Sequence, residues 1–236
     1  MMTPLQLFDI LLTTFGPQHW WPGDTPFEVA VGAVLTQNTT WSNVEKAITS
    51  LKAANAMTAS SLLALSASDL EQAVWPTGYY RVKARYLRTL AVWVSQRATG
   101  DLSSLMSEDA GALRCEILAL HGVGRETADS ILLYAIGKPA FVVDTYTRRI
   151  AARLRLLPDT ATYERTQQYF VARLPEDAHL LNEFHALLIR LAKEHCRARP
   201  VCLACPLEQC CPSADTSPAT GHAVRVRTMP ERRTTP

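Results

Sequence analysis

No stretch of the 236-residue sequence is apolar for the roughly 18 residues that a membrane-spanning helix requires. Residues 1–15 lack the basic flank that precedes the apolar part of an export signal. Hydrophobic residues make up 47% of the chain and charged residues 19%, which excludes disordered chains, collagen-like chains and small disulfide scaffolds. We therefore expect a cytoplasmic globular protein with no membrane partner, long enough for one large or two modest domains.

The chain also lacks a net charge of either sign outside its last residues. Lys and Arg total 24 and Asp and Glu 22, and residues 213–236 carry four arginines against two acidic residues. Charge alone therefore does not indicate a nucleic-acid partner, and any such indication must come from motifs. The same residues 213–236 are rich in Ser, Thr, Pro and Arg and contain no aromatic residue, which predicts a disordered tail.

Strand-like runs are almost absent, since only residues 141–143 form one and they are too few to seed a sheet. Apolar residues recur at helical spacing through most of the chain. Capping signatures at Thr25, Ser42 and Ser66 predict three helix starts. The sequence therefore predicts an all-α fold of roughly ten helices with short connections.

Five of the six cysteines fall within residues 196–211. Cys202 and Cys205 form a Cys-x-x-Cys pair, and Cys196 and Cys211 each stand five residues outside it, with Cys210 as a neighbour. Four thiolates so close in sequence are typical of one metal centre. Disulfides are the alternative, and the absence of an export signal disfavours them. The spacing leaves zinc and a four-iron cluster open, because zinc ribbons usually pair two Cys-x-x-Cys motifs.

A second motif lies at residues 118–131, which read as a helix, a tight turn with Gly122 and Gly124, and another helix. We expect both glycines to allow positive φ and a close approach of a backbone phosphate. The free N–H groups at the start of the following helix then face that phosphate. With Val123 pointing inward, the pattern predicts a helix-hairpin-helix phosphate clamp; the alternative is an ordinary turn between helices.

Asp144 follows a Gly-x-Pro turn at residues 137–139 and comes directly before an apparent helix start. A carboxylate in that position is commonly an N-cap. It is equally suited to face a cleft, where the helix dipole stabilises its charge.

The hairpin, the Gly-x-Pro turn, Asp144 and the cysteine loop, in this order, resemble the endonuclease III branch of the helix-hairpin-helix DNA glycosylases. Asp144 stands eighteen residues after Glu126, as in that pattern, and the resemblance extends over residues 20–212. It includes the motifs at residues 35–39 and 78–84.

The resemblance implies two helical domains with double-stranded DNA across the cleft between them and a damaged base flipped into that cleft. It also implies a 4Fe-4S cluster, with zinc as the alternative occupant. The implied boundaries are 24–136 for a six-helix domain with the hairpin at 113–135, 1–23 plus 137–195 for the second domain, and 196–212 for the cluster loop.

Three departures from this family bear on the chemistry. Glu126 stands where bifunctional members carry the lysine that attacks the sugar, and a carboxylate cannot form that imine. The first cysteine gap is five residues where endonuclease III has six, and His121 replaces a common proline. We therefore expect a monofunctional enzyme that leaves an intact abasic site.

Tryptophans are arranged as in the branch called 3-methyladenine DNA glycosylase III. Trp20 and Trp21 are adjacent, and Trp41 follows Asn38 by three residues. An alkylated purine is electron-poor or cationic and favours an indole face, and stacking offsets part of the cost of flipping the base. The resemblance therefore implies that Trp20, Trp21, Asn38 and Trp41 form the base pocket; the alternative is that the tryptophans are core residues at the domain interface.

The resemblance also assigns roles to single residues. Asp144 would be the catalytic residue that stabilises the cationic sugar and orients water, by the logic of glycoside hydrolysis. Gln37 would enter the gap left by the flipped base. The remaining assignments are Gly122, Val123, Gly124, Arg125 and Thr127 for DNA binding, and Cys196, Cys202, Cys205 and Cys211 for the metal.

The function that these expectations describe is a monomeric DNA N-glycosylase of base excision repair, with an alkylated purine as its lesion. One alternative is a bifunctional glycosylase and abasic-site lyase that acts on oxidised pyrimidines. Another, of a different class, is a non-enzymatic iron–sulfur protein that binds damaged DNA.

Overall fold

The structure is a computed structural model that describes residues 2–20 and 23–214, and over these ranges it is helical and has no strand. The predicted all-α fold is confirmed. Trp21 and residues 215–236, on which most of the tail prediction falls, lie outside the described residues. The helices are α1 (Pro4–Phe15), α2 (Pro26–Leu35), α3 (Trp41–Ala53), α4 (Ala59–Ala64), α5 (Ala67–Val74), η1 (Trp75–Thr77), α6 (Tyr80–Arg97), η2 (Leu102–Ser107), α7 (Ala110–Leu118), α8 (Arg125–Ser130), η3 (Ile131–Ile136), α9 (Thr145–Arg153), α10 (Tyr163–Val171) and α11 (Ala178–Glu194).

Two of the three predicted helix starts are observed. Thr25 accepts a hydrogen bond from the N–H of Glu28, and Ser66 accepts one from the N–H of Asp69. The prediction at Ser42 is wrong, because the N-cap of α3 is Thr40. Asn38 has a left-handed backbone (φ 51°), and the chain is already helical from Trp41, so Ser42 lies within the first turn.

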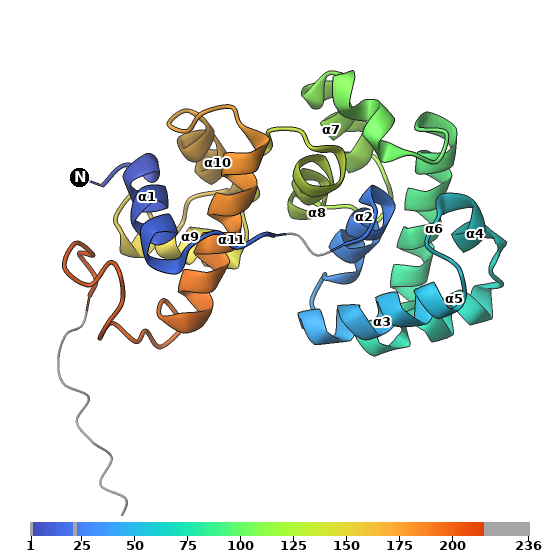
Figure 1. The fold of residues 1–236 in the computed structure, drawn as a ribbon, viewed down its shortest axis with the longest axis horizontal. Helices are drawn as coiled ribbons and strands as arrows, with labels where there is room; N and C mark the ends of the chain where they lie inside the picture. Colours follow the sequence, from blue (N-terminus) through green and yellow to red (C-terminus); the bar gives the residue numbers. More distant parts are fainter. Residues whose placement is uncertain (1, 21–22, 215–236) are drawn as a thin grey trace, which may run out of the picture.

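The helices form two lobes, each with its own hydrophobic core (Figure 1). The first lobe consists of α2 to α8, and its buried residues run from Phe27 to Ile136. The second lobe consists of α1, α9, α10 and α11, so that segments from both parts of the chain share one core. Residues 141–143, the strand-like run, are buried in the second core as extended chain. The domain boundaries implied by the resemblance stay a prediction.

A buried carboxylate connects the two lobes. Asp129 of α8 is fully buried and accepts hydrogen bonds from Arg114 of α7, with Nε at 2.6 Å. It also accepts bonds from the Tyr163 hydroxyl at 2.6 Å and the Gln167 side-chain amide at 2.7 Å, both on α10. A buried charge is tolerated when it is paired and hydrogen-bonded, so this network fixes how α8 lies against the second lobe.

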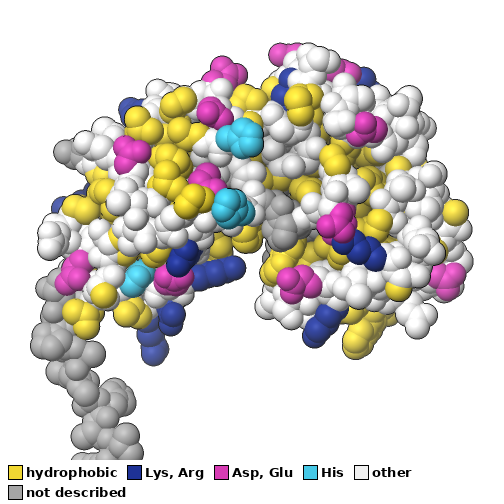
Figure 2. Space-filling view, viewed as in Figure 1, with side chains coloured by type: hydrophobic (Ala, Val, Ile, Leu, Met, Phe, Trp, Pro, Cys, Tyr) yellow, Lys and Arg dark blue, Asp and Glu magenta, His cyan; other side chains and the backbone are white. Residues whose placement is uncertain are grey.

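The surface is hollowed between the two lobes, with Lys and Arg side chains along the lower margins of the hollow (Figure 2). Tyr134, on the π-helix η3, packs against both cores at this junction. No helix within the described ranges is long and apolar enough to cross a membrane.

Candidate active site

The turn between α7 and α8 has the helix–turn–helix form that the sequence predicts. Gly122 has a φ of +90°, and a Cβ there would lie 2.1 Å from the ring of Tyr86. Only glycine therefore fits at Gly122. The expected positive φ at Gly124 is not observed, because its φ is −89° and it is the N-cap of α8. Its expected contact with a phosphate stays a prediction. A Cβ on Gly124 would meet no atom within 4 Å, so this position is open to an approaching ligand.

Gln37 lies against the hairpin, on the loop that follows α2. Its side-chain nitrogen donates to Gly122 O at 3.0 Å and to the hydroxyl of Thr127 at 3.1 Å. Thr127 and Val123 are both 7% exposed and anchor the hairpin in the first core. Arg125 is exposed and forms an ion pair with Glu164 of α10. The structure thus brings five of the six predicted DNA-binding residues together at the hairpin, while Arg125 faces the second lobe.

Asp144 is the N-cap of α9, as one of the two readings of the sequence predicts. Its Oδ1 accepts a hydrogen bond from the N–H of Thr147 at 2.6 Å, and its side chain is 11% exposed. Its Oδ2 lies 3.6 Å from Nε2 of His185. Burial acts to raise the pKa of Asp144, but the facing His185 and the cap bonds from Thr147 outweigh it and lower that pKa below 3.8. The carboxylate is therefore anionic at neutral pH.

The sequence did not indicate His185 and Tyr134, two residues that lie beside Asp144. His185 of α11 is 4% exposed, and its Nδ1 is hydrogen-bonded with the hydroxyl of Tyr134. Burial, and then the charges of Asp144 and Glu126, hold the pKa of Tyr134 well above its usual value of 10.0, so its hydroxyl stays protonated. His185 stands in an apolar helical stripe, where a histidine is indistinguishable from a core residue, and the only local signal is its polarity.

Glu126, which the resemblance is expected to place at the lysine position of bifunctional family members, belongs to the same electrostatic group as Asp144 and His185. Its side chain is exposed, yet the surrounding walls remove part of its hydration, which raises its pKa above 4.5. The charge of Asp144 raises it further, whereas His185 lowers it. The surroundings thus stabilise the anionic form of Asp144 and favour the neutral form of Glu126.

Two of the predicted pocket tryptophans are neighbours. Trp20 and Trp41 are half-buried, and their ring centroids lie 6.3 Å apart with a tilt of 43°. Trp20 is the last described residue of the segment that follows α1. This segment is bound to the second lobe by the N–H of Gln18, which donates to the carboxylate of Glu183 on α11. Asn38 is exposed on the loop before α3. The structure therefore brings Trp20 and Trp41 together, and Trp21 is not described.

The four predicted ligand cysteines line one hollow between α9, α11 and the loop after α11. Each is half-buried, whereas Cys210 is exposed, and all are free thiols. Arg149 and Arg153 of α9 hold the start of the loop by bonds to Cys196 O at 2.8 Å and Cys196 Sγ at 3.2 Å. Within the described part of the chain, however, no group of three or more His, Cys, Asp or Glu side chains is arranged to hold a metal ion. Four cysteine thiols are the donor type of a thiolate-bound centre, but their arrangement does not show one, and the metal stays a prediction.

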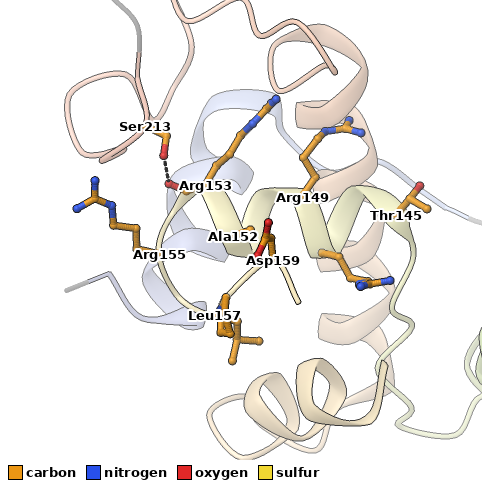
Figure 3. A pocket seen from close by; sticks show the side chains of 10 residues that line it. Thr145, Arg149, Ala152, Arg153, Arg155, Leu157, Asp159 and Ser213 are labelled. Carbon is orange, nitrogen blue, oxygen red and sulfur yellow. Dashed lines mark hydrogen bonds between the residues drawn. The ribbon is translucent and has the colours of Figure 1, made fainter. Parts of the chain in front are cut away.

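A basic pocket lies on the outer side of α9 (Figure 3). Arg148 and Arg155 are exposed, and Thr145, Asp159 and Ser213 are among the other residues that line it. Sequence analysis missed this pocket, although four arginines within residues 148–155 were a usable signal. Because Arg148 is one helical turn from Asp144, the positive surface begins beside the candidate catalytic carboxylate.

Comparison with known proteins agrees with the helical fold. The chain is 38% identical over 207 residues to the putative DNA repair glycosylase MJ1434 of Methanocaldococcus jannaschii, covering 87% of this chain and 94% of the relative. It is 30% identical to endonuclease III of Thermotoga maritima, covering 79% and 82%.

Solved structures of DNA glycosylases have the same architecture. A trapped endonuclease III–DNA covalent intermediate matches with a TM-score of 0.76 and 28% identity, covering 90% of this chain and 97% of that one. The 3-methyladenine DNA glycosylase of Helicobacter pylori bound to 1,N6-ethenoadenine matches with a TM-score of 0.71 and 26% identity, covering 82% and 98%. The family model for HhH-GPD superfamily base excision DNA repair proteins matches residues 31–176. The chain therefore belongs to the HhH-GPD superfamily of base excision DNA repair proteins.

Proposed function

We propose that this protein is a DNA N-glycosylase that holds a flipped, damaged base between its two lobes and hydrolyses the glycosidic bond. The observation that carries the proposal is the carboxylate of Asp144, which is anionic, 11% exposed and fixed at the start of α9. Family membership and the DNA complexes of endonuclease III support DNA as the partner. The proposal takes that partner to be double-stranded DNA with a damaged base, bound by a monomer of this protein.

Asp144 supplies the negative charge that the reaction requires. Loss of the base leaves positive charge on the sugar, and a fixed carboxylate stabilises that charge better than mobile water does. Because Oδ1 is held by the N–H of Thr147, Oδ2 is the oxygen left to face the sugar or to orient the attacking water.

The lysines support monofunctional hydrolysis. Glu126 occupies the lysine position and cannot form an imine. Lys138, the nearest lysine in sequence to this motif, donates from its amine to the backbone oxygen of Glu108. Lys83 is 3% exposed and donates to Leu35 O and Thr77 O. Both amines are therefore engaged in structural bonds.

The neighbouring rings of Trp20 and Trp41 support an alkylated purine as the lesion. Two indoles 6.3 Å apart offer electron-rich faces, and such faces favour a cationic or electron-poor base. The similarity to a 3-methyladenine DNA glycosylase with 1,N6-ethenoadenine bound points to the same class of base.

We also propose a 4Fe-4S cluster on Cys196, Cys202, Cys205 and Cys211, with zinc as the alternative. The support is the common hollow that these thiols line and the two arginines of α9 that hold the loop. A bound centre of either kind would cross-link this loop, and no step of the hydrolysis is assigned to it. Iron analysis and absorption at the blue end of the visible spectrum distinguish the two metals.

Excision assays on labelled duplexes test the function. The duplexes carry an alkylated purine, an oxidised pyrimidine, uracil or thymine opposite guanine, or an abasic site, and each reaction is read with and without hot alkali. Strand breaks that need alkali support a monofunctional glycosylase and identify its lesion. Breaks without alkali support the bifunctional alternative, and binding without excision on every duplex supports a non-enzymatic damage-binding protein.

A further inference from the structure

His185 carries a buried polar atom that faces Asp144. Its side chain is 6% exposed, and its Nε2 has no hydrogen-bond partner among the described residues. The nearest charged atom is Oδ2 of Asp144 at 3.6 Å, which is beyond hydrogen-bond length by about 0.7 Å. A buried nitrogen without a partner costs stability, so this position is unfavourable unless the contact with Asp144 closes at some stage.

Tyr134 determines which nitrogen of His185 carries the proton. Its hydroxyl is bonded to Nδ1, and a phenol that stays protonated can donate there. In the opposite arrangement Nδ1 would carry the proton and the lone pair of Nε2 would face the carboxylate, which is repulsive. The hydrogen bond at Nδ1 and the facing carboxylate therefore place a proton on Nε2, directed at Oδ2.

The three residues come from three separate elements. Tyr134 lies on the π-helix η3, Asp144 at the start of α9, and His185 on α11. π-Helical turns within longer helices occur often at functional sites. Tyr134, Asp144 and Glu126 are the titratable groups that face His185 from η3, α9 and α8.

We propose that the Tyr134–His185 pair is a positioning device for Asp144, in which Nε2–H of His185 binds Oδ2 when damaged DNA closes the site. With Oδ1 held by Thr147 and Oδ2 held by His185, the carboxylate cannot rotate, and its remaining lone pairs are directed at the sugar and the attacking water. This inference rests on the proposed role of Asp144 in excision. His185 is a positioning residue and contacts neither DNA nor water in this scheme.

Three substitutions test the pair in single-turnover excision. His185→Leu keeps the volume and removes the donor, and we expect a rate about 10–100-fold lower with unchanged affinity for the damaged duplex. His185→Gln, which places an amide donor near Nε2, is expected to recover part of that loss. Tyr134→Phe removes only the hydroxyl and is expected to lower the rate and to alter its pH profile, because the imidazole proton is no longer fixed.

Tyr169→Phe is the matched control, since it removes the hydroxyl of another second-lobe tyrosine, whose ring contacts Arg173. It is expected to retain the wild-type rate. A readout independent of activity is nitrogen NMR of the protein with labelled histidine, with His185 assigned by comparison with His185→Gln. We expect a proton on Nε2 in the wild type, and in Tyr134→Phe a part of the molecules with the proton on Nδ1 in place of Nε2.

The outcomes separate the inference from the function on which it rests. A normal rate in His185→Leu beside an inactive Asp144→Asn overturns the positioning role and leaves the glycosylase proposal intact. The absence of a proton from Nε2 in the wild type also overturns it, whether or not His185→Leu folds. A wild-type protein that excises no base overturns both proposals together.

Discussion

The side-chain amide of Gln37 donates to the hydroxyl of Thr127, 90 residues further along the chain, over 3.1 Å. The same nitrogen donates to Gly122 O at 3.0 Å. The loop after α2 and the hairpin are therefore one surface, in which the residue expected to fill the gap in the duplex is held by the motif expected to bind the backbone. The geometry of the hairpin consequently determines where Gln37 lies.

The two hairpin glycines are expected to respond differently to substitution. Gly122→Ala forces a Cβ to within 2.1 Å of the Tyr86 ring at a φ of +90°, and we expect it to lower the free energy of unfolding by about 2–4 kcal/mol. Gly124→Ala is the matched control for stability, because its Cβ has open space and its φ is −89°. Urea unfolding measures both, and equal losses of stability would contradict the assignment of strain to Gly122.

Asp144→Asn separates the two roles of this residue. Asparagine is as good an N-cap as aspartate, so α9 and the fold are expected to remain. The negative charge is lost, and we expect single-turnover excision to fall about 10²–10³-fold with little change in duplex affinity. Circular dichroism and binding measurements are the controls. Near-normal excision would show that Asp144 is only a cap.

The elements that could be predicted from the sequence are those with local causes. The starts of α2 at Thr25 and α5 at Ser66 are encoded within four residues each, and both are observed. Ser42 carries a similar signal and fails, because the left-handed turn at Asn38 starts the helix earlier.

The surroundings of Asp144 could not be predicted, because their causes are not local. His185 meets Tyr134, a residue 51 positions away, only after α11 has packed against η3. The sequence motif identified the carboxylate, whereas its buried neighbours depend on tertiary packing. The same holds for the fixed position of Gln37 on the hairpin, since its partners lie 85 and 90 residues away.

Glu126→Lys tests why we expect this protein to lack lyase activity. The substitution places an amine in the electrostatic environment that Glu126 shares with Asp144 and His185, where a nearby carboxylate can assist imine formation. We expect the variant to be trapped on damaged duplexes by borohydride and the wild type not to be trapped. Glu126→Gln is the control, since it removes the charge without adding a nucleophile. Trapping of the wild type would contradict the monofunctional proposal.

The basic pocket on α9 is expected to add to the electrostatic part of DNA binding. Arg148 and Arg155 are exposed there, whereas Arg153 is bound to the cysteine loop through Arg197 O at 2.6 Å. If Arg148 contacts a phosphate, Arg148→Ala lowers affinity equally for all sequences and reduces the salt dependence by about one unit of the log–log slope. Arg173→Ala, in the turn after α10, is the control for loss of an exposed arginine. An unchanged salt slope in Arg148→Ala would place the DNA elsewhere.

The buried amine of Lys83 is expected to make the free energy of unfolding rise at alkaline pH. Lys83 is 3% exposed, and its amine donates to Leu35 O at 2.9 Å and Thr77 O at 2.8 Å. Burial lowers the pKa of Lys83 from 10.5 to about 8. A neutral amine has two N–H donors, enough for both carbonyls, so the fold keeps these bonds when the proton leaves.

The free energy of unfolding depends on pH here because the folded and unfolded states bind different numbers of protons. Between pH 8 and 10.5 the unfolded chain holds the Lys83 proton and the folded chain has released it, so this group makes the free energy of unfolding rise with pH, by up to about 3 kcal/mol. Below pH 8 Lys83 is protonated in both states, and it contributes nothing to the pH dependence of the free energy of unfolding.

Lys83→Met removes the titration and leaves two buried carbonyls unpaired. We therefore expect the variant to be less stable at every pH, and its free energy of unfolding to lack the rise between pH 8 and 10.5. Denaturant unfolding from pH 7 to 10.5 measures the difference between the two proteins, in which the cysteines and tyrosines that they share cancel. Parallel curves over that range would mean that Lys83 keeps an ordinary pKa in the folded protein.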